Sequence, residues 1–322
     1  MREARQRRAD RIREIEAGML PGAEARRLGW DDLEQGIKDS YRVKGRRSTT
    51  TLEYRLQHLA RHLGSLRATQ ITTARAKRYA SDRNDEGAAY GTVNRELTKL
   101  KTALNIAHRD GKLSRVPFIE MLEEATPRQG FCEPAELAAI IEKLPEQHKR
   151  WPQVCFLTGW RKRSVLTLPR SARRNGLVYL EGEQTKNKEP VAFPDEGALK
   201  SVLDEQEAYV RRVEHRTGKV IPWMFCYPDG KPIKFPDDYW RAACKAAGKP
   251  GLTVHDLRRS AVRQADALGI PRDVYKAMAG IKTDSVYSRY NITNAKRKLE
   301  AARKLPGLPE PESAVAGQIR VK

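Results

Sequence analysis

The sequence has no long hydrophobic run, few cysteines and few aromatic residues. No stretch approaches the roughly 20 consecutive apolar residues that a membrane-spanning helix needs. The N-terminal stretch MREARQRRADRIREIE has no apolar centre of the kind found in secretory signals. These absences predict a soluble protein that is neither inserted in a membrane nor secreted. With 39% hydrophobic residues over 322 positions, the chain is long enough for two domains and a sizeable core.

Cysteine is scarce, and its spacing excludes two common uses. Cys132, Cys155, Cys226 and Cys244 lie far apart, and no Cys-x-x-Cys pair occurs. A disulfide framework or a structural zinc site would need closer and more regular spacing. The pattern therefore predicts buried free thiols in a reducing compartment, and we expect neither a metal nor a cofactor.

Acidic residues are outnumbered by basic ones, and the excess indicates a polyanionic partner. The chain carries 62 Lys and Arg against 41 Asp and Glu, a formal net charge of +21. Basic side chains that neutralise phosphates on duplex DNA release counterions, so such binding is strong and salt-sensitive. A merely solubilising charge remains an alternative. Binding to an acidic membrane surface is disfavoured, because no helix pairs an apolar face with a basic one.

The first part of the chain predicts an arm followed by a small helical domain. Residues 1–29 are predicted to form an arginine-rich arm or linker helix. It contacts DNA, is the stub of a larger N-terminal module, or is simply solvated. Across residues 30–125, apolar side chains recur at helical spacing in four segments. One of these segments carries Leu52, Leu56, Leu59 and Leu63, and we expect a threonine of the run 49–51 to cap it.

The polar faces of these helices carry the basic residues that we predict to contact DNA. They are Lys44, Arg46, Arg47, Arg75, Lys77, Arg78, Lys99 and Lys101. A solvated helix face is the alternative interpretation for each of them.

The second part of the chain predicts a mostly helical domain, residues 131–305, after a linker at 126–130. Pro134 occupies a first helical position. Two short strands, 177–180 and 191–193, flank the turn QTKNKEP. Helices are predicted at 196–213, 237–247, 254–268, 271–279, 283–291 and 294–304, and a tail follows at 306–322. The predicted fold class is thus mainly α with a small antiparallel β-sheet.

Within this domain, residues suited to phosphate chemistry occur in four separate motifs. His255 and Arg258 are three residues apart, so one helix can direct both toward the same anion. The other motifs are Thr158-Gly159-Trp160-Arg161 at a helix start, Lys186 in the strand turn, and Tyr290 in the string RYNI. Each motif alone is more often structural, since surface arginines and lysines are usually solvated and tyrosines usually pack.

Taken together and in this order, the motifs resemble those of the tyrosine recombinase (phage integrase) family. The resemblance covers about residues 30–305. It implies a two-domain DNA clamp, with a helical core-binding domain ahead of a catalytic domain. It also implies that Arg161 and Arg258 are the two catalytic arginines, that Lys186 is the hairpin lysine, and that His255 precedes the second arginine. Tyr290 would be the nucleophile.

The physical chemistry of phosphodiester exchange needs these residue types. Negative charge gathers on the non-bridging oxygens as a fifth oxygen approaches phosphorus, and two guanidinium groups stabilise that charge in the transition state. The Tyr290 hydroxyl must lose a proton as it attacks, and His255 is positioned in sequence to accept it. Lys186 would protonate the leaving 5′ oxygen.

Several positions leave alternatives open. Lys188 rivals Lys186 within the turn, and Tyr287 and Tyr275 rival Tyr290 as the nucleophile. The family usually has His or Trp after Gly280, where this chain has Ile281, which cannot donate a hydrogen bond. We therefore expect a slower cleavage step, unless the neighbouring Lys282 substitutes. A milder departure is Ser164, where an acidic residue is common in the family.

The function implied by the resemblance is site-specific DNA recombination through a 3′-phosphotyrosine intermediate, integrating or excising a phage or other mobile element. Its partners would be double-stranded DNA attachment sites, three further copies of the chain around a Holliday junction, and an accessory bending or directionality factor. For the tail 306–322 two interpretations stay open, docking on a neighbouring protomer and a disordered extension. The implied location is the nucleoid of a bacterial host's cytoplasm. The alternatives are a catalytically weakened DNA-binding protein of the same fold and a type IB topoisomerase.

Overall fold

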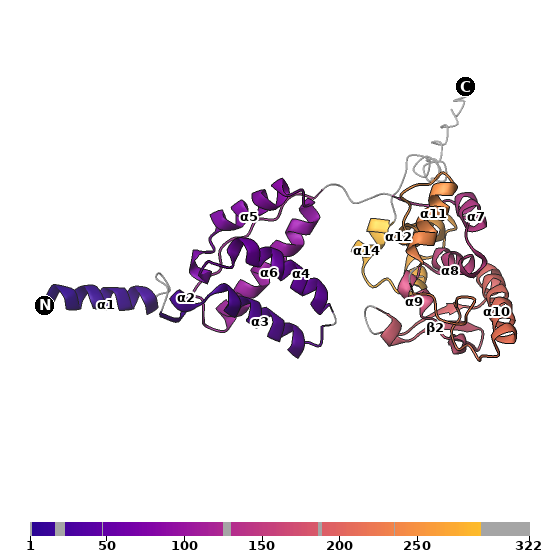
Figure 1. The fold of residues 1–322 in the computed structure, drawn as a ribbon, viewed down its shortest axis with the longest axis horizontal. Helices are drawn as coiled ribbons and strands as arrows, with labels where there is room; N and C mark the ends of the chain where they lie inside the picture. The colour runs from indigo at the N-terminus through magenta and orange to yellow at the C-terminus, as the bar shows by residue number, and fades with distance from the viewer. Residues whose placement is uncertain are drawn as a thin grey trace, which may run out of the picture. The chain divides into compact units, whose positions relative to one another are not determined.

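The computed structural model describes residues 2–16, 23–46, 48–124, 130–185, 189–234 and 236–290. The chain divides into two compact units, Met1–Pro127 and Arg128–Lys322 (Figure 1). Several predicted features lie outside the described residues, namely Arg47, Lys186, Lys188, the linker positions 126–129, the helix 294–304 and the tail 306–322.

The first unit is helical throughout its described secondary structure. Its α-helices are α1 (Arg2–Glu16), α2 (Ala23–Arg27), α3 (Trp30–Val43), α4 (Thr49–Leu63), α5 (Thr73–Asp85) and α6 (Tyr90–Arg109). Helices α3, α4 and α5 each pack against α6. The apolar stripes predicted from the sequence are buried there, including all four leucines of α4. The predicted threonine cap of α4 is wrong: the helix begins at Thr49 itself, after Ser48, and no side chain caps it.

One charged cluster is buried inside the first unit. The Arg83 guanidinium donates to both carboxylate oxygens of Glu96 at 3.0 Å, and the Tyr79 hydroxyl donates to the same carboxylate at 2.6 Å. Glu86 also pairs with Arg83. Because Glu96 is fully buried and Arg83 nearly so, each charge requires the other to be present.

The second unit surrounds helix α8 (Arg150–Thr158), which packs against both α10 (Gly197–Thr217) and α12 (Val254–Ala267). Its other α-helices are α7 (Pro134–Glu142), α9 (Lys162–Leu166), α11 (Asp237–Ala246), α13 (Arg272–Ala279) and α14 (Asp284–Tyr290). Pro134 is the first residue of α7, as predicted. All four cysteines are buried.

The sheet of the second unit is antiparallel, in the order β1-β2-β3. Strands β2 (Leu177–Leu180) and β3 (Val191–Pro194) are the two that the sequence predicts. Strand β1 (Arg173–Arg174) was not predicted, because a two-residue strand has no measurable alternation. It turns into β2 through Asn175 and Gly176, both with positive φ, which is the geometry that favours Asn-Gly in tight hairpins. The predicted fold class is confirmed.

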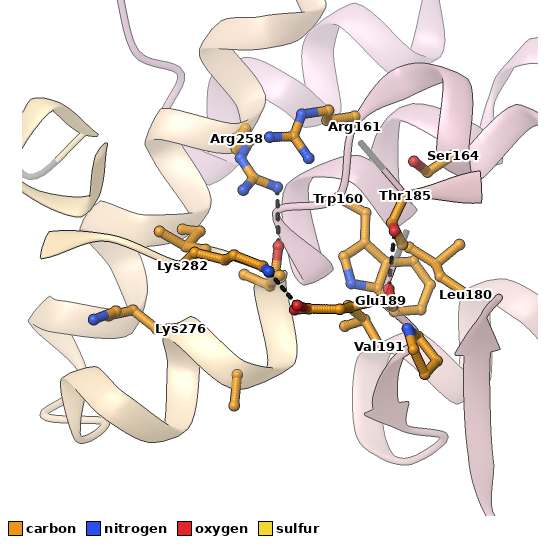
Figure 2. A pocket seen from close by; sticks show the side chains of 15 residues that line it. Trp160, Arg161, Ser164, Leu180, Thr185, Glu189, Val191, Arg258, Lys276 and Lys282 are labelled. Atoms are coloured by element: carbon orange, nitrogen blue, oxygen red, sulfur yellow. Dashed lines mark hydrogen bonds and ion pairs between the residues drawn. The ribbon is translucent and has the colours of Figure 1, made fainter. Parts of the chain in front are cut away.

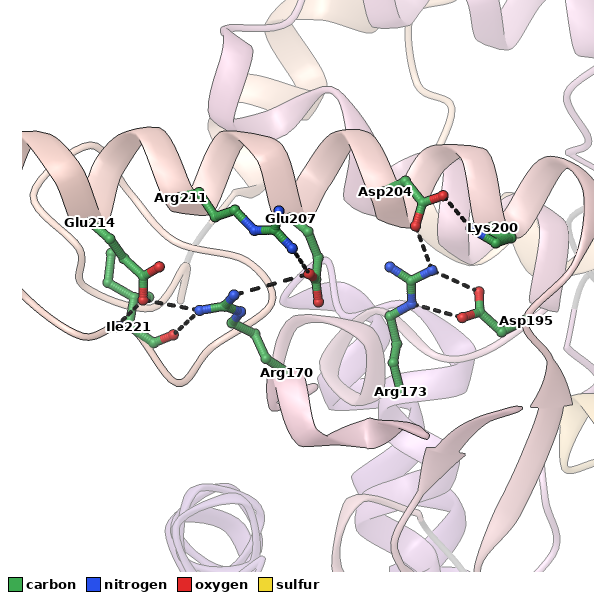
Figure 3. A network of polar contacts seen from close by, with 9 residues as sticks. All are labelled: Arg170, Arg173, Asp195, Lys200, Asp204, Glu207, Arg211, Glu214 and Ile221. Atoms are coloured by element: carbon green, nitrogen blue, oxygen red, sulfur yellow. Dashed lines mark hydrogen bonds and ion pairs between the residues drawn. The ribbon is translucent and has the colours of Figure 1, made fainter. Parts of the chain in front are cut away.

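Ion pairs fasten helix α10 to the sheet (Figure 3). Arg173 of β1 donates to Asp195, just after β3, at 2.8 Å, and to Asp204 of α10 at 2.7 Å. Arg170 reaches Glu214, further along the same helix, at 3.0 Å. Since Arg173 and Asp195 are both largely buried, this network fixes the sheet against helix α10 at the end of the hairpin away from the β2–β3 turn.

Candidate active site

The turn between α8 and α9 positions Arg161. Gly159 ends α8 in the left-handed region, with φ +68°. A Cβ there would lie 2.7 Å from the Tyr275 hydroxyl, so both the backbone and the space require glycine. The Thr158 hydroxyl accepts from the Trp160 amide at 3.1 Å, and the buried Trp160 indole donates to the Met278 carbonyl at 2.9 Å. Arg161 then precedes α9 as its N-cap residue.

The first turn of α12 is fixed by a buried carboxylate. Asp256 accepts from the backbone amide of Thr253 at 2.8 Å and from its hydroxyl at 2.7 Å, which is a capping arrangement. One turn on, the Ser260 hydroxyl donates to the Asp256 carbonyl and accepts from the Cys132 amide at 2.7 Å. The helix that carries His255 and Arg258 therefore has a fixed start.

Arg161 and Arg258, 97 positions apart in the chain, line one cavity (Figure 2). Its volume is about 290 Å³. The lining residues are Trp160, Arg161, Ser164, Leu180, Thr185, Glu189, Pro190, Val191, Arg258, Lys276, Ala277, Ala279, Gly280, Ile281 and Lys282. Among these described lining residues four are cations and one is an acid, so the cavity suits an anion.

The two arginines are held differently. Arg258 is buried, and its Nη1 donates to the backbone carbonyls of Gly159 and Ala279, the latter at 3.0 Å. Carbonyl oxygens accept these bonds without neutralising the charge. Arg161 is half-buried, and among the described residues its guanidinium has no hydrogen-bond or ion-pair partner. Its donors are thus available to a ligand in the cavity.

His255 lies in the first turn of α12 and is not among the residues that line the cavity. Part of its surface is exposed. Packing around the ring still lowers the pKa of His255, and the positive charges of Arg259, Arg258 and Arg161 lower it further. The imidazole is therefore neutral at pH 7 and able to accept a proton. That Arg258 and Arg161 act on it electrostatically indicates that it lies near both.

Lys186 lies outside the described residues, and so does the side chain of Tyr290, so the structure describes only their neighbours. Lys186 lies between two described neighbours of the β2–β3 turn, where the Thr185 hydroxyl donates to the Glu189 carbonyl at 2.9 Å. The Ser164 hydroxyl donates to the Gln184 carbonyl at 2.7 Å, tying α9 to this turn. Ser164, where the family commonly has an acid, thus has a structural contact of its own.

Tyr290 is the last residue of α14, and its side chain lies outside the described part of the structure. The two rival tyrosines are in the core. Tyr275 is 3% exposed and Tyr287 is 1% exposed, and both hydroxyl oxygens are buried. Their burial argues against either of them as the nucleophile, so Tyr290 stays the predicted one.

Ile281 is buried against Tyr275 and Tyr287, and it also borders the cavity. It contributes packing where the family has a hydrogen-bond donor. Two charged cavity residues were missed by sequence reasoning, Lys276 and Glu189. No sequence signal identifies them, because they reach the cavity from α13 and from the hairpin only in the folded chain.

The described residues among those predicted to contact DNA fall into three groups. Arg46 and Lys99 come together over the Tyr41 ring, at 4.9 and 5.5 Å from its centre. Lys77 and Arg78 are exposed, but they form ion pairs with Glu120 and Asp82, each at 2.9 Å. Lys44, Arg75 and Lys101 are exposed. Arg46 and Lys99, gathered around an aromatic ring and facing no carboxylate in the described contacts, are the better candidates for DNA contact.

Two classes of feature are not found in the described residues. They contain no group of three or more His, Cys, Asp or Glu side chains that could hold a metal ion. None of the described helices is both long enough and apolar enough to cross a membrane.

The fold is that of tyrosine-type integrases. Among solved structures, a lambda integrase dimer bound to a COC′ core site matches with a TM-score of 0.69 at 18% identity, over 88% of this chain and 81% of that one. The Tn1549 transposon integrase (residues 82–397) with circular intermediate DNA matches with a TM-score of 0.68 at 15% identity, over 86% and 100%. A lambda integrase tetramer on a Holliday junction matches with a TM-score of 0.66 at 18% identity, over 81% and 77%.

Sequence comparison alone does not detect this relationship. No protein-family model matches the chain, and no curated protein matches it in sequence. The resemblance in fold first suggested by scattered motifs is confirmed by the three-dimensional comparison.

Proposed function

We propose that this protein is a tyrosine-type site-specific DNA recombinase that cuts and rejoins duplex DNA at the attachment sites of a phage or other mobile element. The observation that carries the proposal is the meeting of Arg161 and Arg258 at one cation-lined cavity. The fold supports it independently, because the matching integrase structures contain DNA. The net charge of +21 suits the same partner.

In the proposed reaction, the scissile phosphate enters the cavity and is bound by both guanidinium groups. The Tyr290 hydroxyl attacks phosphorus while neutral His255 accepts its proton. The bond from phosphorus to the 5′ oxygen breaks, and Lys186 supplies a proton to that oxygen. The 3′-phosphotyrosine keeps the energy of the broken bond, so a second DNA 5′ hydroxyl can reverse the step and join a new strand.

The remaining parts of the proposal concern assembly. The two units would contact DNA together as a clamp, with residues 30–125 binding through Arg46, Lys99 and neighbouring cations. Exchange between two sites needs each strand cut in turn, so four copies on a junction are proposed, as in the lambda integrase tetramer. An accessory bending factor and a location at the bacterial nucleoid belong to the same proposal.

A covalent capture experiment tests the enzyme class without knowledge of the target sequence. The purified protein is mixed with a pool of random-sequence duplexes nicked in one strand, so that a short 5′-hydroxyl fragment diffuses away after cleavage and rejoining is blocked. DNA that remains attached to protein in denaturant is recovered and sequenced. The wild type should yield adducts that share a common sequence, and Tyr290→Phe should yield none. Tyr287→Phe is the matched control, because the Tyr287 hydroxyl is buried, and this variant should retain the adducts.

Other outcomes identify the alternatives. Salt-sensitive DNA binding without adducts in the wild type would indicate a DNA-binding protein that has lost catalysis, with Ile281 as one cause. Adducts without sequence preference, together with relaxation of any supercoiled plasmid by a monomer, would indicate a type IB topoisomerase. Adducts that persist in Tyr290→Phe would contradict the assignment of the nucleophile.

A further inference from the structure

An ion pair joins two of the residues that line the cavity. The Lys282 amino group donates to the Glu189 carboxylate, although the two residues are 93 positions apart (Figure 2). The Lys282 side chain is 47% exposed and the Glu189 side chain 62%. Water therefore screens the pair, and its contribution to stability is small. Both residues also line the cavity that holds Arg161 and Arg258.

The pair joins two segments that matter to the proposed reaction. Glu189 closes the β2–β3 turn, where its carbonyl accepts from Thr185, and it directly follows the three residues that include Lys186. Lys282 lies between Ile281 and helix α14, which ends at Tyr290. The contact therefore links the hairpin of the candidate general acid to the segment before the candidate nucleophile.

The charges in the cavity are not equally available. Arg161 faces no acidic partner among the described residues, whereas Lys282 is covered by Glu189. A DNA phosphate that enters the cavity carries the same charge as the Glu189 carboxylate and would be repelled by it. The same phosphate would compete with that carboxylate for the Lys282 ammonium, which offers three donors.

We propose that Lys282 is a third phosphate-binding cation of this cavity, and that Glu189 occupies it until DNA displaces the carboxylate. The inference rests on the proposed function and deepens it. Lys282 then supplies the hydrogen-bond donor that Ile281, packed against Tyr287, does not supply.

The two partners should have opposite effects on catalysis. Lys282→Met removes the donor, and the rate of adduct formation on the captured sequence should fall about ten- to a hundredfold, somewhat less than for a fully buried donor. Glu189→Gln removes the competitor, and the rate should rise about two- to fivefold, the range that an exposed ion pair spans. Lys282→Met combined with Glu189→Gln should behave like Lys282→Met alone.

Matched controls separate this effect from net charge. Lys231 and Asp229 form an exposed pair at 3.1 Å in the same unit, and neither residue lines the cavity. Lys231→Met and Asp229→Asn make the same charge changes as the test variants and should leave adduct formation within about twofold. Thermal melting of every variant checks that folding is intact.

A purely structural role predicts a different pattern. If the pair only braces the hairpin, Lys282→Met and Glu189→Gln should both slow the reaction, and the reversed pair Lys282→Glu with Glu189→Lys should restore it. The proposal requires the reversed pair to be at least as slow as Lys282→Met, because a carboxylate would then extend from position 282. Equal slowing by both single variants, or rescue by reversal, overturns it.

A second measurement does not depend on recombination. Titration calorimetry with inorganic phosphate should show tighter binding in Glu189→Gln and weaker binding in Lys282→Met than in the wild type. If the wild type forms no adducts but this order holds, the proposed function fails and the phosphate site stands. If adducts form but phosphate binding is unchanged in both variants, the role of Lys282 is overturned while the proposed function stands.

Discussion

Arginine is buried in both units, but the surroundings of the buried groups differ. In the first unit, Arg83 contacts the carboxylates of Glu96 and Glu86, and its charge is neutralised within the protein. In the second unit, the Nη1 group of Arg258 donates to backbone carbonyls, and half-buried Arg161 has no partner among the described residues. In the first arrangement carboxylates neutralise the guanidinium charge, whereas the acceptors of the Arg258 Nη1 group are backbone carbonyls, which carry no full charge.

This difference separates a structural arginine from a candidate binding arginine better than burial does. A buried guanidinium that is paired contributes to a stable core only while its partner remains. An arginine held without a counterion repels nearby cations, which costs stability unless a ligand arrives. The second arrangement is expected where the ligand itself supplies the negative charge, as a phosphodiester does.

The largest effect is expected from breaking the ion pair of Arg83 and Glu96. Glu96→Gln keeps the shape of the side chain but leaves Arg83 with a buried, partly uncompensated charge, so the first unit should lose about 3–5 kcal/mol of stability. Amide hydrogen exchange in α5 and α6 measures the loss within that unit. The double variant Arg83→Met with Glu96→Leu removes both charges and should lose less than the single variant. A single variant as stable as the wild type would show that the cluster is not energetically coupled.

Replacing Arg161 should slow the reaction without lowering the stability of the fold. Arg161→Gln removes a guanidinium that has no partner among the described residues, so the melting temperature of the variant should match that of the wild type or exceed it slightly. The rate of adduct formation should fall about 10²–10³-fold, as when one oxyanion donor is lost. A marked loss of stability without a change in rate would show that Arg161, like Arg83, has a structural role.

The sequence predicted the helical stripes and both longer strands, because local periodicity reports directly on which side chains are buried. Strand β1 was missed although its Asn175-Gly176 turn carries a known hairpin signal. The partners of the site could not be predicted at all. The bond from Trp160 to Met278 and the pair of Lys282 with Glu189 join segments 118 and 93 positions apart, and periodicity holds no information on such pairs.

The candidate site was predictable in part for a different reason. Arg161 and Arg258 were identified because they stand in short motifs, and both line the cavity. The same reasoning could not distinguish which lysines are already paired, as Lys77 is with Glu120, because that depends on the fold. The motifs identify residue types, whereas the folded chain decides which charges remain available.

The next expected effect concerns Gly159, whose carbonyl accepts from Arg258. An alanine there would suffer the strain of its positive φ and would also crowd the Tyr275 hydroxyl at 2.7 Å. Gly176 has a similar φ of +71° and nothing within 4 Å, so Gly176→Ala measures the backbone strain alone. Gly159→Ala should be less stable than this control by about 1–3 kcal/mol of crowding in urea unfolding. Equal losses would mean that the neighbours of Gly159 yield without cost.

The smallest expected effect tests whether the neighbouring arginines lower the pKa of His255. Its pKa lies below the ordinary value of 6.5, so the imidazole stays neutral until the pH falls below that lowered value. If His255 accepts the tyrosine proton, adduct formation should decline only at pH values below about 6.5. Arg259→Gln removes one of the charges that lower this pKa, so the midpoint of the decline should move to higher pH.

Arg263→Gln is the matched control for this shift. Arg263 lies one turn further along α12, over the Phe131 ring at 3.8 Å, and is not among the main charges that shift the pKa of His255. Its midpoint should stay where the wild type has it. A midpoint that moves equally in both variants would reflect net charge alone, and one that moves in neither would mean that another group accepts the proton. Only a shift confined to Arg259→Gln connects the positive charge of Arg259 to the protonation state of His255.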